Sequence, residues 1–217
     1  IKRIAHQAAL TKSRHLILLT GVPGAGKTLV GLQTVHARYL DDLAVTRDNG
    51  KPTTPAVVLS GNGPLVEVLQ SEMRSAGDGK TFVRGVKDYV KRYPSKRSLV
   101  PPEHVLVFDE AQRAFDTDKM RESHDNEHAR SEPEEFISFA DRIPEWCVVV
   151  GLIGSGQEIH VGEEAGLAQW RTAVESSDKR SEWTIHAPTA VAGLFHDGVV
   201  PFEQRPALNL DVELRFH

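Results

Sequence analysis

The chain has 217 residues, a net charge of −4 at pH 7 and a single cysteine, Cys147. The length suits one α/β domain, the single cysteine excludes an internal disulfide, and the weak negative charge disfavours indiscriminate binding to polyanions. No apolar run approaches the roughly 18 residues of a membrane span, and no signal-peptide pattern opens the chain. We therefore expect a cytoplasmic protein with no membrane partner.

Strand-like and helix-like segments alternate along the chain. Short aliphatic runs predict strands, and apolar residues at helical spacing predict the helices between them. The predicted strands cover 15–20, 56–60, 81–83, 104–108, 147–153, 183–185 and 207–216. The predicted helices cover 27–40, a segment that begins near 65, a basic segment after 83 and 163–176, while 41–55 is predicted to be loop. This alternation predicts an α/β fold with a mostly parallel central sheet flanked by helices.

The chain ends and one polar segment bear on domain organisation. Residues 117–133 are polar and lie between two predicted strands, so we expect an exposed loop there. The chain begins at Ile1 rather than at a methionine, and it stops at His217 just after a strand-like run. We therefore expect residues 1–217 to be a single domain cut from a longer protein.

A glycine-rich loop follows the first predicted strand. It matches the eight-position phosphate-binding pattern in full, with Gly21, Val22, Pro23, Gly24, Ala25, Gly26, Lys27 and Thr28. Glycines let successive backbone N–H groups converge on one anion, and the helix that follows adds its positive N-terminal end. Lys27 is expected to reach the β- and γ-phosphates of ATP, and the Thr28 hydroxyl is expected to coordinate Mg²⁺.

An acidic pair closes the strand predicted over 104–108. Asp109 and Glu110 follow that strand directly, and open parallel sheets bind ligands at the carboxyl ends of their strands. We expect Asp109 to hold the Mg²⁺ shell and Glu110 to polarise the attacking water. Because a kinase must exclude water, a carboxylate in this place favours hydrolysis over transfer to a small-molecule acceptor.

Three segments resemble one known family. Residues 109–112 read Asp-Glu-Ala-Gln, which resembles motif II of the superfamily 1 helicases. Residues 60–65, and 151–159 with 162–167 and Trp170 behind them, resemble the Schlafen-like DNA/RNA helicase domain found in bacterial proteins. The resemblance spans about residues 15–217. It implies a RecA-like P-loop NTPase fold that forms the first of two motor lobes.

The resemblance also implies roles for particular residues. Gln157 matches a glutamine that senses the γ-phosphate, and Arg215 matches an arginine that reaches the γ-phosphate from the neighbouring lobe. Gln7 lies upstream of the glycine-rich loop, where superfamily 1 proteins place a glutamine that reads adenine. Leu152 follows Gly151 where the superfamily carries an aspartate, so the link between ATP and strand movement is expected to be built differently.

Two groups of residues are candidates for binding nucleic acid. The resemblance places Ser60 and Asn62, after the second predicted strand, against a nucleic-acid backbone. Arg84, Lys87 and Lys91 are spaced i, i+3 and i+7, so a helix would align them on one face that can neutralise phosphates. A solvated, charged helix face is the alternative explanation for that spacing.

Taken together, these features predict Mg²⁺-dependent ATP hydrolysis coupled to movement on, or unwinding of, single-stranded or duplex DNA or RNA. A second motor lobe is the expected partner in the full-length protein. One alternative is an ATP-driven switch that acts on a protein partner without nucleic acid. Another is a binding module that holds nucleotide without cleaving it. A small-molecule kinase fits less well, because Glu110 has a clearer role beside water.

Overall fold

The computed structural model describes residues 1–36, 38–46, 50, 52–76, 79–94, 99–111, 131–154 and 161–212. Within these ranges eight strands form one sheet, and every hydrogen-bonded strand pair in it is parallel. The order is β5-β4-β6-β7-β1-β8-β9, and β10 pairs with the end of β1. The strands are β1 Arg14–Gly21, β4 Ala56–Ser60, β5 Val83–Gly85, β6 Val105–Phe108, β7 Cys147–Gly154, β8 Trp183–Ala187, β9 Phe202–Gln204 and β10 Asn209–Leu210. The predicted α/β fold with a parallel sheet is confirmed.

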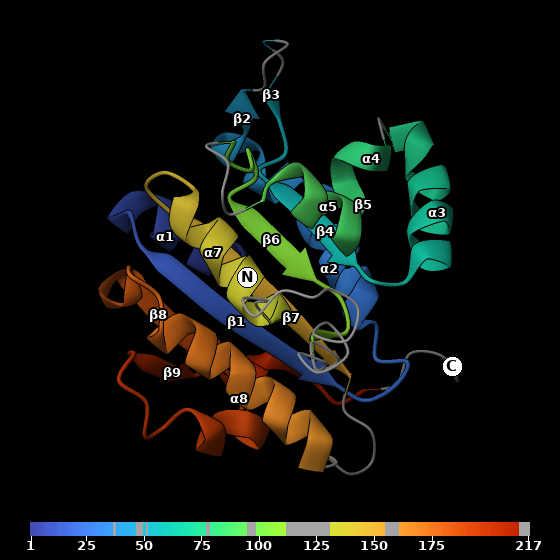
Figure 1. Ribbon diagram of the computed structural model, residues 1–217. Coiled ribbons are helices and arrows are strands. Elements are labelled where there is room, and N and C mark those ends of the chain that lie inside the picture. The colour runs from blue at the N-terminus through green and yellow to red at the C-terminus, as the bar shows by residue number, and fades with distance from the viewer. Residues whose placement is uncertain are drawn as a thin grey trace, which may run out of the picture.

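Helices cover both faces of the sheet (Figure 1). One core layer lies between the sheet and α5, α7 and α8, and the other lies between the sheet and α1, α2 and α3. The helices are α1 Lys2–Thr11, α2 Lys27–His36, α3 Gly63–Glu72, α4 Gly79–Phe82, α5 Val86–Arg92, α7 Glu132–Arg142 and α8 Val161–Glu175. Strands β1 and β7 are buried along almost their whole length, which explains their continuous aliphatic runs. Among the described residues, no helix combines the length and apolar composition required to cross a membrane.

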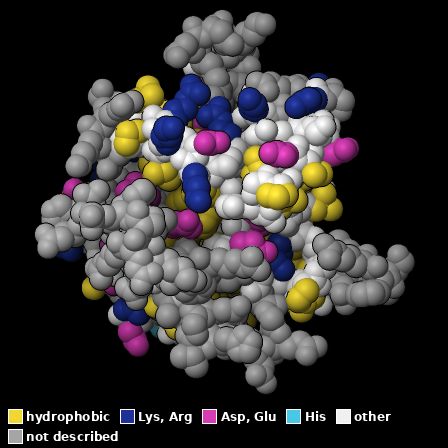
Figure 2. All heavy atoms as spheres, turned by 45° about the vertical axis from the view of Figure 1, so that its right-hand side comes forward, with side chains coloured by type: hydrophobic (Ala, Val, Ile, Leu, Met, Phe, Trp, Pro, Cys, Tyr) yellow, Lys and Arg dark blue, Asp and Glu magenta, His cyan; other side chains and the backbone are white. Residues whose placement is uncertain are grey.

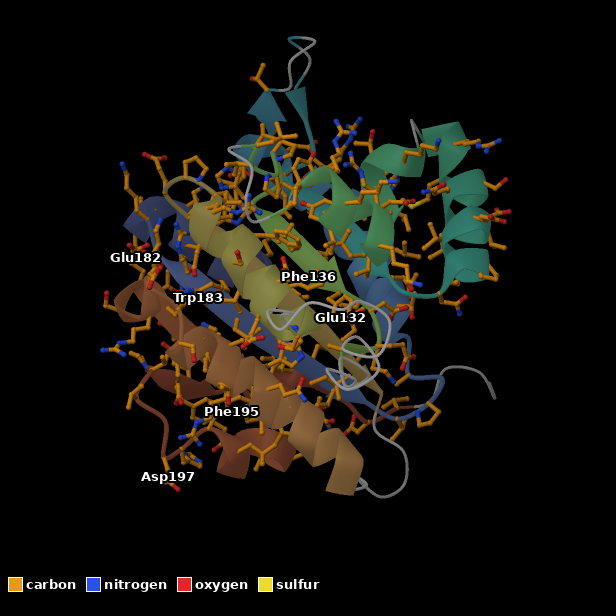
Figure 3. All side chains as sticks on the ribbon, in the orientation of Figure 1. Glu132, Phe136, Glu182, Trp183, Phe195 and Asp197 are labelled. Atoms are coloured by element: carbon orange, nitrogen blue, oxygen red, sulfur yellow. The ribbon has the colours of Figure 1, made fainter. Side chains whose placement is uncertain are left out.

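An aromatic cluster holds α7 and α8 against the sheet. Phe108 of β6 packs on Phe136 of α7 with ring centroids 4.5 Å apart, and Trp170 of α8 contacts both rings. Figure 3 shows Phe136 on α7, in front of the sheet. The Trp170 indole also donates a hydrogen bond of 3.0 Å to the Ala111 carbonyl. Trp170 is therefore a core residue, and it fixes the backbone that follows the acidic pair.

Two predicted boundaries near the site were wrong. Residues 79–82 form α4, so strand β5 begins at Val83 and not at residue 81. The end of the expected loop 117–133 belongs to α7: Ser131 is the N-cap, and it forms a reciprocal capping box with Glu134, a strong helix-start signal. Residues 117–130 of that expected loop lie outside the described residues.

Three further differences concern helix α1, the end of helix α2 and the segment between α2 and β4. Helix α1 was not predicted, because the residues that it buries are the small Ala5 and Ala8, which give a weak apolar signal. Helix α2 ends at His36, before the predicted residue 40, and residues 38–43 form a 3₁₀ helix. The expected loop 41–55 contains a small antiparallel hairpin, β2 (Val45–Thr46) and β3 (Pro52–Thr53).

Strands β1 and β8 share a buried pair of histidines. His15 Nδ1 and His186 Nε2 lie 2.8 Å apart, so one ring must donate and the other must accept. Ser13 Oγ lies 2.9 Å from His15 Nε2, and Glu203 Oε2 lies 3.4 Å from His186 Nδ1. Burial lowers the pKa of both histidines, that of His186 to about 4, where the nearby His15 adds to the effect. The folded protein therefore favours two neutral rings.

The histidine pair predicts a loss of stability in mild acid. A histidine in the unfolded chain has a pKa of about 6.5, so below that pH the unfolded chain binds protons that the folded chain does not. The contribution of the neutral histidine pair to the free energy of unfolding is complete above pH 6.5. It is lost as the pH falls from 6.5 toward the pKa of about 4 that His186 has in the fold. We expect the free energy of unfolding, measured by urea denaturation, to fall by about 2 kcal/mol between roughly pH 7 and pH 5.

A matched pair of variants tests the source of this pH dependence. His186→Gln should show a flatter dependence of unfolding free energy on pH than the unmodified chain. His36→Gln, at an exposed position on α2, controls for the loss of an imidazole and should keep the full dependence. Equal slopes in all three proteins would show that the buried pair is not responsible.

Candidate nucleotide site

The loop between β1 and α2 is a tight turn that contains two glycines in the left-handed region. The Ala25 N–H donates to the Val22 carbonyl at 3.1 Å, which closes the turn. Gly24 and Gly26 have positive φ angles of 80° and 87°. A side chain disfavours this left-handed region, because its Cβ approaches the following carbonyl oxygen too closely. Two glycines of the sequence pattern are therefore required by the shape of the turn.

Gly31 sets how closely α2 lies against the sheet. A Cβ at this position would lie 3.0 Å from Leu152 of β7 and 3.3 Å from Val107 of β6. Since glycine has no Cβ, the helix can approach both strands. This close packing fixes the N-terminal end of α2, and with it the glycine-rich loop, relative to β6 and β7.

Two side chains at the start of α2 connect the loop to the acidic strand end. The Lys27 ammonium donates to the carbonyls of Gly21 at 2.7 Å and Val22 at 3.0 Å. The Thr28 hydroxyl donates to the Asp109 carboxylate over a long distance of 3.5 Å. The fold therefore brings the loop and the end of β6 together, although 81 positions separate Thr28 from Asp109 in the sequence.

Asp109 is held at a buried strand end. Its N–H donates to the Leu59 carbonyl of β4 at 2.9 Å, and the residue is only 6% exposed. Burial raises the pKa of the Asp109 carboxyl, and the adjacent Glu110 charge raises it further. The Thr28 hydroxyl and the Lys27 charge act in the opposite direction. A cation beside this carboxylate would favour its ionised form.

Glu110 has a left-handed backbone conformation. Its φ is 57°, which costs a non-glycine residue roughly 1–2 kcal/mol. Both neighbours of Glu110 are fixed by hydrogen bonds: the Asp109 N–H donates to a carbonyl of β4, and the Ala111 carbonyl accepts from the Trp170 indole. The surrounding contacts therefore impose the strain, and the regular alternation of the strand ends at the acidic pair.

Ser60 and Asn62 lie where β4 passes into α3. Ser60 is the buried last residue of β4, and its hydroxyl accepts from the Asn62 N–H at 3.2 Å. Asn62 is the N-cap of α3, and its side chain accepts from the Leu65 N–H at 3.2 Å, a usual role for asparagine. Both side chains thus shape the turn, and Asn62 is also exposed to solvent.

The basic residues selected from the sequence do not share one helix. Arg84 lies in β5 and α5 begins after it, so the helical alignment of Arg84 with Lys87 and Lys91 was wrong. Residues 83–85 are extended because they pair with β4. Arg84 Nε donates to the Lys80 carbonyl at 2.9 Å, and its guanidinium lies 3.7 Å from the buried Glu103 carboxylate. Lys87 and Lys91 are exposed on α5.

A pocket at the β5 edge of the sheet is bounded by α3, α4, β5 and α5. Its volume is about 630 Å³, within the range of ligand pockets. Its charged lining residues are Glu67, Lys80, Arg84, Asp88 and Arg92. Figure 2 shows Lys and Arg side chains gathered on the face that carries these elements. Lys80 and Arg92 are not among the residues that the sequence predicts to bind nucleic acid, and only the fold places them beside Arg84.

Three residues with roles implied by the resemblance are not tested by this geometry. Gln157 and Arg215 lie outside the described residues. Gln7 is exposed on α1, and its carbonyl accepts from the Thr11 hydroxyl at 2.9 Å. Their roles remain predictions.

Comparisons with known proteins agree with the fold and the loop. Residues 14–217 match the model of a family described as Schlafen group 3, DNA/RNA helicase domain. The chain is also similar to a shikimate kinase from Chlorobium luteolum, with 26% identity over 144 residues that cover 60% of this chain and 71% of the relative. No solved structure matches the chain. The chain is thus a nucleotide-binding protein of the P-loop type, as its sequence predicted.

The backbone of Glu110 leads to a prediction about stability. At most positions alanine is more stabilising than glycine by roughly 0.5–1 kcal/mol, but at a positive φ the order reverses. We expect Glu110→Gly to resist urea denaturation better than Glu110→Ala by about 1 kcal/mol. Neither variant has the carboxylate, so the comparison isolates the backbone. A more stable alanine variant would mean that the left-handed conformation is not imposed.

Proposed function

The chain belongs to the Schlafen group 3 DNA/RNA helicase domain family, and on that premise we propose that it hydrolyses ATP with Mg²⁺ and couples hydrolysis to movement on, or unwinding of, DNA or RNA. One observation carries the proposal: the Thr28 hydroxyl at the end of the glycine-rich loop meets the Asp109 carboxylate at the end of β6. A triphosphate on the loop would therefore lie beside the acidic pair.

The loop and the start of α2 supply the positive field that a triphosphate requires. Backbone N–H groups of the loop and the N-terminal end of α2 both attract anions. Lys27 donates to the carbonyls of Gly21 and Val22. A phosphate oxygen carries a full charge, so it would draw the ammonium more strongly than those neutral carbonyls. We assign Lys27 to the β- and γ-phosphates.

Thr28 and Asp109 fit a Mg²⁺ ion. Both offer oxygen atoms, which Mg²⁺ prefers, and these oxygens lie 3.5 Å apart, near the roughly 3 Å between adjacent ligands of an octahedral ion. Burial raises the pKa of Asp109, and a cation bound to the carboxylate would offset that effect. When bound, Mg²⁺ supplies positive charge to the phosphate oxygens.

Glu110 is the proposed residue for activating water. It follows Asp109 directly at the end of β6, next to the place assigned to the γ-phosphate. A carboxylate there can accept a hydrogen bond from water and orient it for in-line attack. The strained backbone of Glu110 agrees with this role, because strain of this kind clusters at functional sites.

Nucleic acid is proposed to bind along the same carboxyl edge of the sheet, over β4 and β5. Ser60 and Asn62 lie at the end of β4, and the pocket that contains Arg84 lies beside β5. The exposed Lys87 and Lys91 extend the positive surface along α5. Basic groups in this arrangement can contact backbone phosphates without reading sequence.

We further propose that residues 1–217 are the first lobe of a two-lobe motor. In that arrangement Gln157 senses the γ-phosphate, Arg215 stabilises the charge on it and Gln7 reads adenine. Since one lobe supplies only part of such a site, we expect weak ATPase activity and no unwinding from this chain alone.

Phosphoryl transfer to a small hydroxyl compound is a second candidate, because the chain is similar to a shikimate kinase. Both reactions require the same loop and cation. ADP release in the absence of any acceptor favours hydrolysis, whereas ADP release that requires an acceptor favours transfer. An ATP-driven switch on a protein partner would hydrolyse ATP without any response to nucleic acid.

Substitution of Glu110 and of the loop lysine tests hydrolysis. Glu110→Gln should lower kcat by about 10²–10⁴-fold while ATP still binds, because the amide cannot act as the base. Lys27→Ala should weaken ATP binding itself, since it removes the charge on the phosphates. ADP release and calorimetric binding of ATP measure the two effects separately.

The control for this test is Glu145→Gln. Glu145 also has a positive φ, 63°, so the control matches both the chemistry and the backbone of Glu110. It should retain normal turnover. If Glu110→Gln also retained normal turnover, the chain would not use this carboxylate, and the hydrolytic assignment would fail.

The nucleic-acid surface is tested by salt dependence. Lys87→Ala combined with Lys91→Ala should weaken binding of a single-stranded oligonucleotide. The negative slope of the logarithm of the association constant against the logarithm of the salt concentration should become shallower by about 1.4, roughly 0.7 for each phosphate that is no longer neutralised. Lys2→Ala combined with Arg3→Ala is the control, because these exposed residues belong to α1 on the opposite face of the sheet. An unchanged slope in the α5 variant would exclude these lysines from the interface.

A further inference from the structure

The last strand of the sheet contacts the phosphate-binding loop directly. Strand β10 pairs in parallel with the end of β1, with Thr20 opposite Asn209 and Gly21 opposite Leu210. The Val22 N–H donates to the Leu210 carbonyl at 3.1 Å. The Thr20 hydroxyl donates to the Asn209 side-chain carbonyl at 2.8 Å. A segment 189 positions away in the sequence therefore holds the junction between β1 and the loop.

The contact at Gly21 is close enough to exclude a side chain. A Cβ at this position would lie 2.8 Å from both the Cβ and the carbonyl oxygen of Leu210. Among the described glycines, positive φ angles occur at Gly24, Gly26 and Gly50 and not at Gly21, so the backbone conformation of Gly21 does not require glycine. The first glycine of the loop pattern is needed here because β10 approaches the backbone so closely.

The same junction supplies the acceptors of the phosphate-binding lysine. Lys27 donates to the carbonyls of Gly21 and Val22, and these are the residues against which Leu210 packs. The position of β10 thus fixes both the path of the loop and the carbonyls that orient the ammonium. A shift of β10 would move the lysine and the loop amides together.

We propose that Asn209 and Leu210 are positioning residues for the phosphate-binding loop, which they hold in its anion-binding shape before nucleotide arrives. A preorganised loop needs no ordering on binding, so the contact should increase affinity for the phosphates. The catalytic carboxylates follow β6, which pairs with β4 and β7 and not with β10. The effect should therefore fall on nucleotide affinity and not on the chemical step. This inference rests on the proposed ATP hydrolysis.

Thr20→Val is the most selective test. Valine keeps the shape of threonine and the buried packing of β1, and it removes only the donor to Asn209. The exposed Asn209 amide can then bond to water, so folding should be little affected. We expect the KM for ATP and the dissociation constant for Mg-ADP to rise about five-fold, the effect of one hydrogen bond, while kcat changes less than about two-fold. Thr20→Ser keeps the hydroxyl and should restore both constants.

Gln204→Ala is the matched control. Its side-chain amide donates to the Thr189 hydroxyl at 2.8 Å, so the control removes an amide–hydroxyl bond of the same length elsewhere on the sheet. It should leave the KM for ATP unchanged. A fall in melting temperature and kcat at constant KM in Thr20→Val would indicate a merely structural contact and would overturn the proposal.

The unmodified chain separates failure of this inference from failure of the proposed function. If it neither binds Mg-ADP nor releases ADP from ATP, the proposed function is wrong, and the loop does not serve nucleotide. If it does both, and Thr20→Val has the same KM and the same Mg-ADP affinity, the positioning role alone is wrong. A raised KM that serine restores, with Gln204→Ala unchanged, supports it.

Discussion

The site depends on one constraint of parallel sheets: the carboxyl ends of all strands lie along the same side of the sheet, so the segments that follow the strands must meet there. This constraint brings Thr28 to Asp109 across 81 positions of sequence. Strand β7 lies between β1 and β6, so the two segments must meet across an intervening strand. Gly151 of β7 leaves room for the segment that follows the acidic pair, since a Cβ there would lie 3.1 Å from both Ala111 and Leu18.

The same edge places the proposed ATP and nucleic-acid sites next to each other. Asp109 is bonded through its N–H to Leu59 of β4, and β4 leads directly into the turn that holds Ser60 and Asn62. A displacement of the acidic strand end would therefore reach that turn through one backbone hydrogen bond. Strand β5 pairs with β4 in turn, which extends the connection to the pocket that contains Arg84.

Local chemistry made the glycine-rich turn and the acidic end of β6 predictable. The loop pattern carries its own requirements, since Gly24 and Gly26 have the positive φ angles that glycine favours, and an acidic pair after a buried strand can lie only at the sheet edge. The basic segment was less predictable. Spacing suggested one helical face for Arg84, Lys87 and Lys91, but pairing with β4 drew Arg84 into a strand, and periodicity within a segment cannot register a partner strand.

By itself, the sequence determined the α/β alternation, the glycine-rich loop and the acidic pair, because each depends on residues that are neighbours in the chain. Only the tertiary structure decided which strands lie side by side, that Glu110 is held at a positive φ, and that Leu210 packs on Gly21. These features arise from contacts between distant segments. Such contacts follow from how the whole sheet is packed, and no single stretch of sequence encodes them.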